Sequence, residues 1–120
     1  MITNFDEITE ELNEDEKRLV PILIKGLSNK EKSNPVTGKQ ICARINAFKD
    51  TYGLKRPFTE PRLRKICNFI RVKGILPLIA TSNGYYVSYD QKEIEAQIES
   101  LNERAAAIQA SAEGLRKFMR

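Results

Sequence analysis

The chain has 120 residues, of which 41% are hydrophobic and 30% charged, and it contains two cysteines and no histidine. This length suits one globular domain, and no apolar run approaches the roughly 18 residues of a membrane span. The acidic N-terminus lacks the basic and apolar regions of a secretory signal, so we expect a cytoplasmic protein. Two cysteines without histidine exclude a disulfide framework and the usual Cys/His zinc site, and we expect no metal or cofactor.

The net charge of +4 is unevenly distributed along the chain. Residues 1–16 contain seven acids and no base, whereas residues 17–74 contain fifteen Lys and Arg against three acids, a net charge of +12. Residues 75–120 are nearly neutral, with five bases and six acids. A segment this basic suits a polyanion such as nucleic acid, because neutralised phosphates release counterions. The alternative is a solvated basic surface on an ordinary domain.

The first predicted elements are an acidic arm and a core helix. Residues 1–12 carry a thin apolar stripe (Ile2, Phe5, Ile8 and Leu12) that predicts a short helix. Asn13 and Glu16 then have the form of a capping box. Apolar residues recur after it at helical spacing: Leu19, Val20, Leu23, Ile24 and Leu27. Pro21 lies inside this helix and should kink or split it, and residues 28–35 read as a loop.

Two further helices are predicted in the basic segment. Thr37 and Gln40 form a second capping box, and this helix should end near Tyr52, with Gly53 beyond it. Its inward face should carry Ile41, Ile45 and Phe48, and its outward face Lys39, Arg44 and Asn46. Thr59 should cap the next helix, which Gly74 stops. The inward side chains of that helix are Leu63, Ile66, Cys67 and Ile70. Cys42 and Cys67 both fall on apolar faces, where a thiol packs as a small hydrophobe.

The pattern then changes from helix to hairpin. Residues 75–80 and 85–89 are rich in strand-forming residues, and a Thr81–Gly84 turn with Asn-Gly at its tip separates them. Pro77 cannot donate a ladder hydrogen bond, which places it at an edge or at the start of its strand.

Residues 90–120 carry a regular heptad stripe behind a third predicted capping box at Asp90 and Glu93. The stripe predicts a helix of about 45 Å. We expect it to form a coiled coil that dimerises the protein, while a helix folded back on its own core is the alternative. Flanking positions specify neither parallel nor antiparallel pairing. The stripe residues are Ile94, Ile98, Leu101, Ala105, Ile108, Ala112, Leu115 and Met119.

The order of three helices followed by a hairpin predicts a winged helix-turn-helix over residues 13–89, mainly α with a small β-hairpin. In that architecture the third helix enters the major groove of DNA. Projection at 100° per residue places Lys65 and Asn68 opposite the apolar face, with arginines on both flanks. We expect base contacts from Arg62, Lys65 and Asn68, and phosphate contacts from Arg64 and Arg71. Further phosphate contacts are expected from Lys39 and Arg44 on the second helix and from Lys55 and Arg56 in the connector.

The segment from Ile66 to Val87, most clearly Ile70-Arg-Val-Lys-Gly-Ile-Leu-Pro-Leu-Ile-Ala-Thr-Ser-Asn-Gly-Tyr-Tyr-Val, followed by a heptad helix, resembles winged helix-turn-helix proteins of bacteriophage and mobile-element origin. The resemblance extends over residues 13–110. It implies a nucleic-acid-binding protein and no catalytic residue.

We find no phosphate-cradling motif and no histidine for acid–base chemistry, so we do not expect an enzyme. The sequence predicts a homodimeric double-stranded DNA-binding protein, either sequence-specific or architectural, that regulates transcription or replication. The alternative is a winged-helix module that binds an acidic protein partner in a larger assembly and does not bind DNA directly. The acidic residues 6–16 either lie over the basic face and compete with DNA or form a plain solvated helix face.

Overall fold

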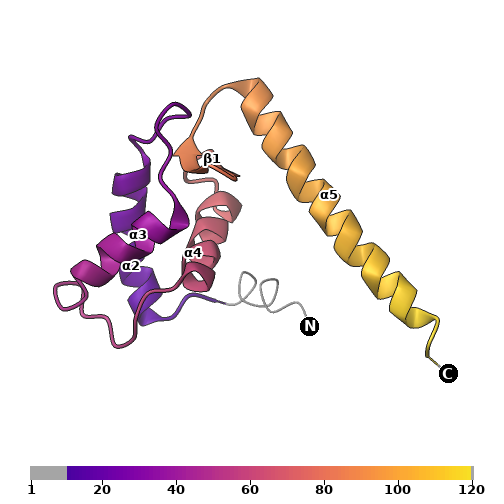
Figure 1. Ribbon diagram of the computed structural model, residues 1–120, viewed down its shortest axis with the longest axis horizontal. Coiled ribbons are helices and arrows are strands. Elements are labelled where there is room, and N and C mark those ends of the chain that lie inside the picture. The colour runs from indigo at the N-terminus through magenta and orange to yellow at the C-terminus, as the bar shows by residue number, and fades with distance from the viewer. Residues whose placement is uncertain (1–10, 120) are drawn as a thin grey trace. The chain divides into compact units, whose positions relative to one another are not determined.

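The computed structural model describes residues 11–119 and divides after Ser88 into two compact units. The first unit contains α2 (Glu14–Leu27), α3 (Gly38–Ala47), α4 (Glu60–Val72), β1 (Leu78–Thr81) and β2 (Gly84–Val87) (Figure 1). The second contains α5 (Gln91–Arg116). The predicted mainly helical chain with a small hairpin and a long final helix is confirmed. The helix predicted over residues 1–12 lies outside the described residues, except for Glu11 and Leu12, which are not helical.

The capping boxes that open α2 and α3 are confirmed. Glu16 N–H donates to Asn13 Oδ1, and Asn13 N–H donates to Glu16 Oε1, both at 2.9 Å. Thr37 and Gln40 exchange the same two hydrogen bonds at the start of α3. Pro21 does not split α2, which runs unbroken from Glu14 to Leu27.

Helix α3 is shorter than predicted, because it ends at Ala47 instead of near Tyr52. Phe48, predicted in the core, is the C-cap and is 51% exposed. Asn46, predicted to face outward, instead donates its amide to Phe58 O at 2.9 Å and accepts from Phe58 N–H at 2.7 Å. These two bonds hold the connector against α3, and the chain must therefore turn after Ala47 to bring buried Leu54 and Phe58 back to the core.

The hairpin has the predicted antiparallel pairing, with Leu78 opposite Val87 and Thr81 opposite Gly84. Val36 adds a bridge on the β2 side of the hairpin, exchanging backbone hydrogen bonds with Tyr85 at 3.0 and 2.7 Å. Gly84 permits this approach: its φ is +128°, and a Cβ there would lie 2.5 Å from Val36 O. The loop before α3 is thus attached to the hairpin at the position of a third strand.

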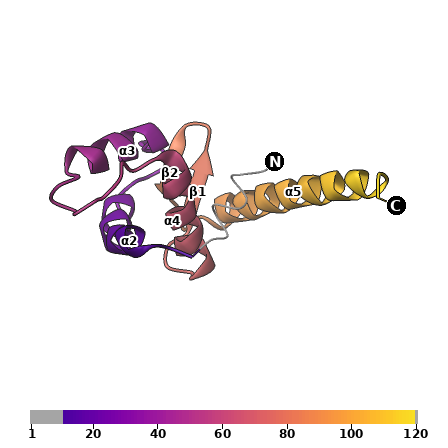
Figure 2. The same ribbon diagram turned by 90° about the horizontal axis from the view of Figure 1, so that it is seen from below.

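The core of the first unit lies where α4 packs against α2, α3 and β1 (Figure 2). Four residues of α4 are at most 1% exposed, namely Leu63, Ile66, Cys67 and Ile70. They were predicted as its inward face, which is confirmed. Leu19 and Leu27 from α2, Ile45 from α3, and Leu78 and Val87 from the hairpin complete this core. Among residues 11–119, no helix combines the length and the apolar character needed to cross a bilayer.

Candidate nucleic-acid interface

The predicted binding residues of α4 do not form one exposed face. Lys65 is only 8% exposed, which contradicts its predicted outward orientation. Its Nζ lies 2.7 Å from Glu16 Oε1, and Arg62 Nε lies 3.2 Å from Glu16 Oε2. The helical projection failed here because it treats α4 as packed on one side only, whereas α2 covers a second side.

Glu16 is the centre of this polar cluster and is 1% exposed. Burial raises the pKa of its carboxyl, but hydrogen bonds from Lys65, the Asn13 backbone and Arg62 outweigh burial and hold the pKa below its usual value. The ionised carboxylate therefore neutralises two of the side chains predicted to contact bases. Glu16, at the end of the acidic segment 6–16, thus contacts Arg62 and Lys65 of the basic segment 17–74.

Arg62 is held by more than the carboxylate. Its Nη1 donates to Pro57 O at 3.0 Å, and its guanidinium lies 5.7 Å from the centre of the Phe58 ring. Arg62, Lys65 and Glu16 line part of an open cleft of about 580 Å³ between the start of α2 and the start of α4. These contacts fix the angle between the two helices.

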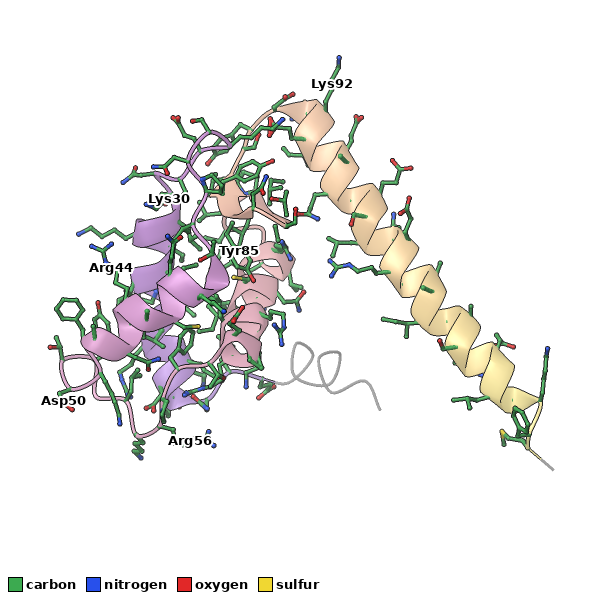
Figure 3. All side chains as sticks on the ribbon, in the orientation of Figure 1. Lys30, Arg44, Asp50, Arg56, Tyr85 and Lys92 are labelled. Atoms are coloured by element: carbon green, nitrogen blue, oxygen red, sulfur yellow. The ribbon has the colours of Figure 1, made fainter. Side chains whose placement is uncertain are left out.

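Arg64, Asn68 and Arg71 are partly exposed on the remaining surface of α4. Arg71 Nε donates to Leu78 O at 3.0 Å, which joins the end of α4 to β1. Arg71 therefore has a structural contact in addition to any contact with a phosphate. Tyr85 belongs to β2, the strand paired with β1, and its side chain points into the first unit (Figure 3). Burial raises the pKa of its hydroxyl to about 12.

The other predicted binding residues are exposed: Lys39 and Arg44 on α3, and Lys55 and Arg56 in the connector. None of the four forms an ion pair with another described residue. Figure 3 shows Arg44 and Arg56 extending outward from different parts of the first unit. These side chains offer full positive charges at the surface but do not converge on one point.

The start of α3, predicted to bind phosphate, has a carboxylate beside it. A Cβ on Gly38 would lie 2.7 Å from Glu60 Oε1, so the Glu60 side chain packs against the first residue of α3. A carboxylate at this position already interacts with the positive end of the helix dipole. A phosphate approaching Lys39 must therefore bind beside Glu60 or displace its flexible, exposed side chain.

The ion-pairing role of Glu16 was not predicted from the sequence, where Glu16 was identified only as a member of a capping box. The signal was present in the spacing, because Glu16 precedes Leu19, Leu23 and Leu27 at intervals of three, four and four residues. An acid on the apolar face of a core helix needs a buried cationic partner. No comparable signal identified Asn46 or Glu60, whose contacts join segments distant in sequence.

Comparison of the chain with protein-family models, with curated proteins and with solved structures finds no match. The residues and contacts described above are therefore the basis of the proposed function.

Proposed function

We propose that the chain is a cytoplasmic winged-helix protein that binds double-stranded DNA, dimerises through α5, and regulates transcription or replication in the manner of the bacteriophage and mobile-element proteins it resembles. The order α2, α3, α4, β1, β2 supports this proposal. The Val36–Tyr85 bridge adds support, because it pairs one residue of the loop before α3 with β2, where a winged helix has a short third strand. No catalytic step is part of the proposal.

The observation that carries DNA binding is that Lys39, Arg44, Lys55 and Arg56 are exposed and form no ion pair with another described residue. Such side chains keep their full charge for phosphates, and phosphate contacts supply most non-specific affinity. Base reading is assigned to Asn68 on the partly exposed surface of α4, and Arg64 on the same surface is assigned the expected phosphate contact. Arg62 and Lys65 contribute chiefly by fixing α4 against α2.

A fluorescence anisotropy titration with duplex DNA tests the proposal. Binding should weaken steeply with salt, and Lys39→Ala combined with Arg44→Ala should reduce the slope of log K against log salt by about 1.8, since each phosphate contact contributes about 0.9. Lys92→Ala is the matched control, because Lys92 is an exposed base on α5. The absence of binding at low salt would overturn the proposal.

The second candidate function is a protein-interaction module, and one surface feature favours it. Phe48, the C-cap of α3, is 51% exposed. The centre of its ring lies 6.3 Å from the centre of the Tyr52 ring. Exposed aromatic side chains are enriched where proteins bind one another. A protein-interaction module should bind a protein partner with little dependence on salt and should not bind duplex DNA. Phe48→Ser should abolish the binding of that partner.

A further inference from the structure

Helix α5 leaves large apolar side chains without cover in the single chain. Ile98 is 52% exposed and Leu115 69%, and Met119, three residues beyond the end of the helix, is 75% exposed. They belong to a stripe with alternating spacings of three and four residues, which assigns Ile98, Ala105, Ala112 and Met119 to heptad position a, and Ile94, Leu101, Ile108 and Leu115 to position d. An a/d stripe of this kind is completed by a second helix that packs its own stripe into it.

We propose that the occupant of this stripe is α5 of a second copy of the chain, aligned antiparallel so that residue i lies opposite residue 213 − i. The inference rests on the dimer proposed above and adds its orientation. In this alignment each a residue of the stripe within α5, namely Ile98, Ala105 and Ala112, faces a d residue of the partner. Ile98 then faces Leu115 of the partner subunit, and Ala105 faces the partner's Ile108.

The sizes of the stripe residues favour the antiparallel alignment. Ala105 and Ala112 occupy consecutive a positions, and in a parallel pair each would face its own copy. Two alanine layers, separated only by the Ile108 layer, would leave the centre of that interface underfilled. In the antiparallel alignment, Ala112 faces the partner's Leu101, so each small side chain meets a large one.

The charges beside the stripe favour the same alignment. In an antiparallel pair, e positions lie beside e positions, and the e residue nearest to Glu95 is Arg116 of the partner subunit, two residues from strict alignment, at both ends of the interface. Asn102 and the partner's Gln109 are e residues related in the same way. A parallel pair would instead align Arg104 with the partner's Gln109 and Ser111 with the partner's Arg116, which gives no opposite-charge pair. Gln97 is already buried in the single chain and does not enter this comparison.

The antiparallel register has a consequence for the dimer. The two Gln91 residues lie about 47 Å apart, because they are separated by 31 residues along the coiled-coil axis at about 1.5 Å per residue. The first units of the two copies are therefore attached at opposite ends of the coiled coil. A parallel dimer would attach them at the same end.

Distances between spin labels test the orientation directly. Ala96 and Glu103 are exposed and occupy the outer f position, so a label there does not enter the interface. The native thiols are poor competitors for the label because both are buried, and burial raises the pKa of Cys42 to about 11 and that of Cys67 to about 12. The two variants are Ala96→Cys and Glu103→Cys, each labelled in the full chain.

The antiparallel register predicts an axial offset of about 31 Å between the labels of Ala96→Cys and of about 10 Å between those of Glu103→Cys. We expect the measured distance to be at least about 10 Å longer in the first variant. Equal distances in a protein that light scattering shows to be dimeric would overturn the antiparallel register and leave the dimer intact. A monomeric mass would overturn the dimer itself. The DNA titration tests DNA binding, and its outcome depends on neither the orientation nor the mass.

Discussion

Lys65 Nζ lies 2.7 Å from Glu16 Oε1, with both side chains at least 90% buried, so α4 is attached to α2 by an internal ion pair. Arg62 contacts the other oxygen of the same carboxylate. A charge removed from water in this way depends on its partner, because loss of one member leaves the other buried and uncompensated. The cluster therefore matters for the stability of the first unit more than for an exposed binding face.

Glu16→Ala should lower the free energy of unfolding by about 3 kcal/mol. The variant leaves Lys65 and Arg62 without their carboxylate, and it also removes one half of the capping box. Denaturant unfolding followed by circular dichroism measures the loss. The matched control is Glu14→Ala, because the Glu14 side chain is 83% exposed, and it should change stability by less than about 0.5 kcal/mol. A similar loss in both variants would contradict the assigned role of Glu16.

The first unit should lose stability as the pH falls below about 4.5. Glu16 and Asp15 both have a lowered pKa; for Asp15 the main cause is the hydrogen bond from Lys55 N–H. Their stabilising effect is complete above the pKa of the unfolded chain and disappears as the pH falls through the folded pKa. Unfolding free energies measured from pH 7 to pH 3 should therefore fall more steeply for the natural chain than for Glu16→Gln. Equal slopes would show that Glu16 is not the responsible group.

Gly84→Ala should destabilise the first unit by at least about 2 kcal/mol. Residue 84 has a φ of +128°, and its added Cβ would meet the Val36 backbone. Gly26→Ala is the control, because Gly26 lies within α2 and a Cβ there meets nothing within 4 Å. That change should raise the melting temperature, since alanine is favoured over glycine in helices by about 1 kcal/mol. A stable Gly84→Ala variant would mean that the loop before α3 need not approach the hairpin.

Asn46→Ala should cost about 1–3 kcal/mol, because the Phe58 N–H and carbonyl group would both lose their side-chain partner. Asn46→Asp should cost less than Asn46→Ala, since a carboxylate can still accept from Phe58 N–H. Melting temperatures of the natural chain, Asn46→Asp and Asn46→Ala, measured by thermal unfolding, should fall in that order. Asn29→Ala, on the exposed loop after α2, provides the control and should leave the melting temperature nearly unchanged.

Charge reversal in α5 should report the pairing of Glu95 with the partner's Arg116. Glu95→Arg and Arg116→Glu each place like charges opposite one another and should each weaken the dimer by about 0.5–2 kcal/mol over two sites, while the double variant restores it. Arg116 also contacts Glu113 in its own helix at 3.0 Å, so only recovery in the double variant identifies the contact between copies. Glu99→Arg, at an outer position, is the control. Sedimentation equilibrium measures the dissociation constants, and additive losses would contradict the antiparallel register.

Sequence by itself determined the local features of this protein. Capping boxes at Asn13 and Thr37, the apolar face of α4 and the Asn-Gly turn of the hairpin depend on residues a few positions apart. Such interactions are set by backbone geometry and helical period, which can be read from spacing. The heptad stripe of α5 could be identified for the same reason.

Only the tertiary structure decided which charged and polar side chains are exposed. Lys65 was predicted at the surface and is buried against Glu16, 49 positions earlier in the chain, and Asn46 turns inward to bind Phe58. A helical projection describes one helix and one partner, whereas α4 is covered by α2, α3 and β1. The polar surface left exposed therefore depends on how the helices pack, and packing brings together residues that local spacing does not relate.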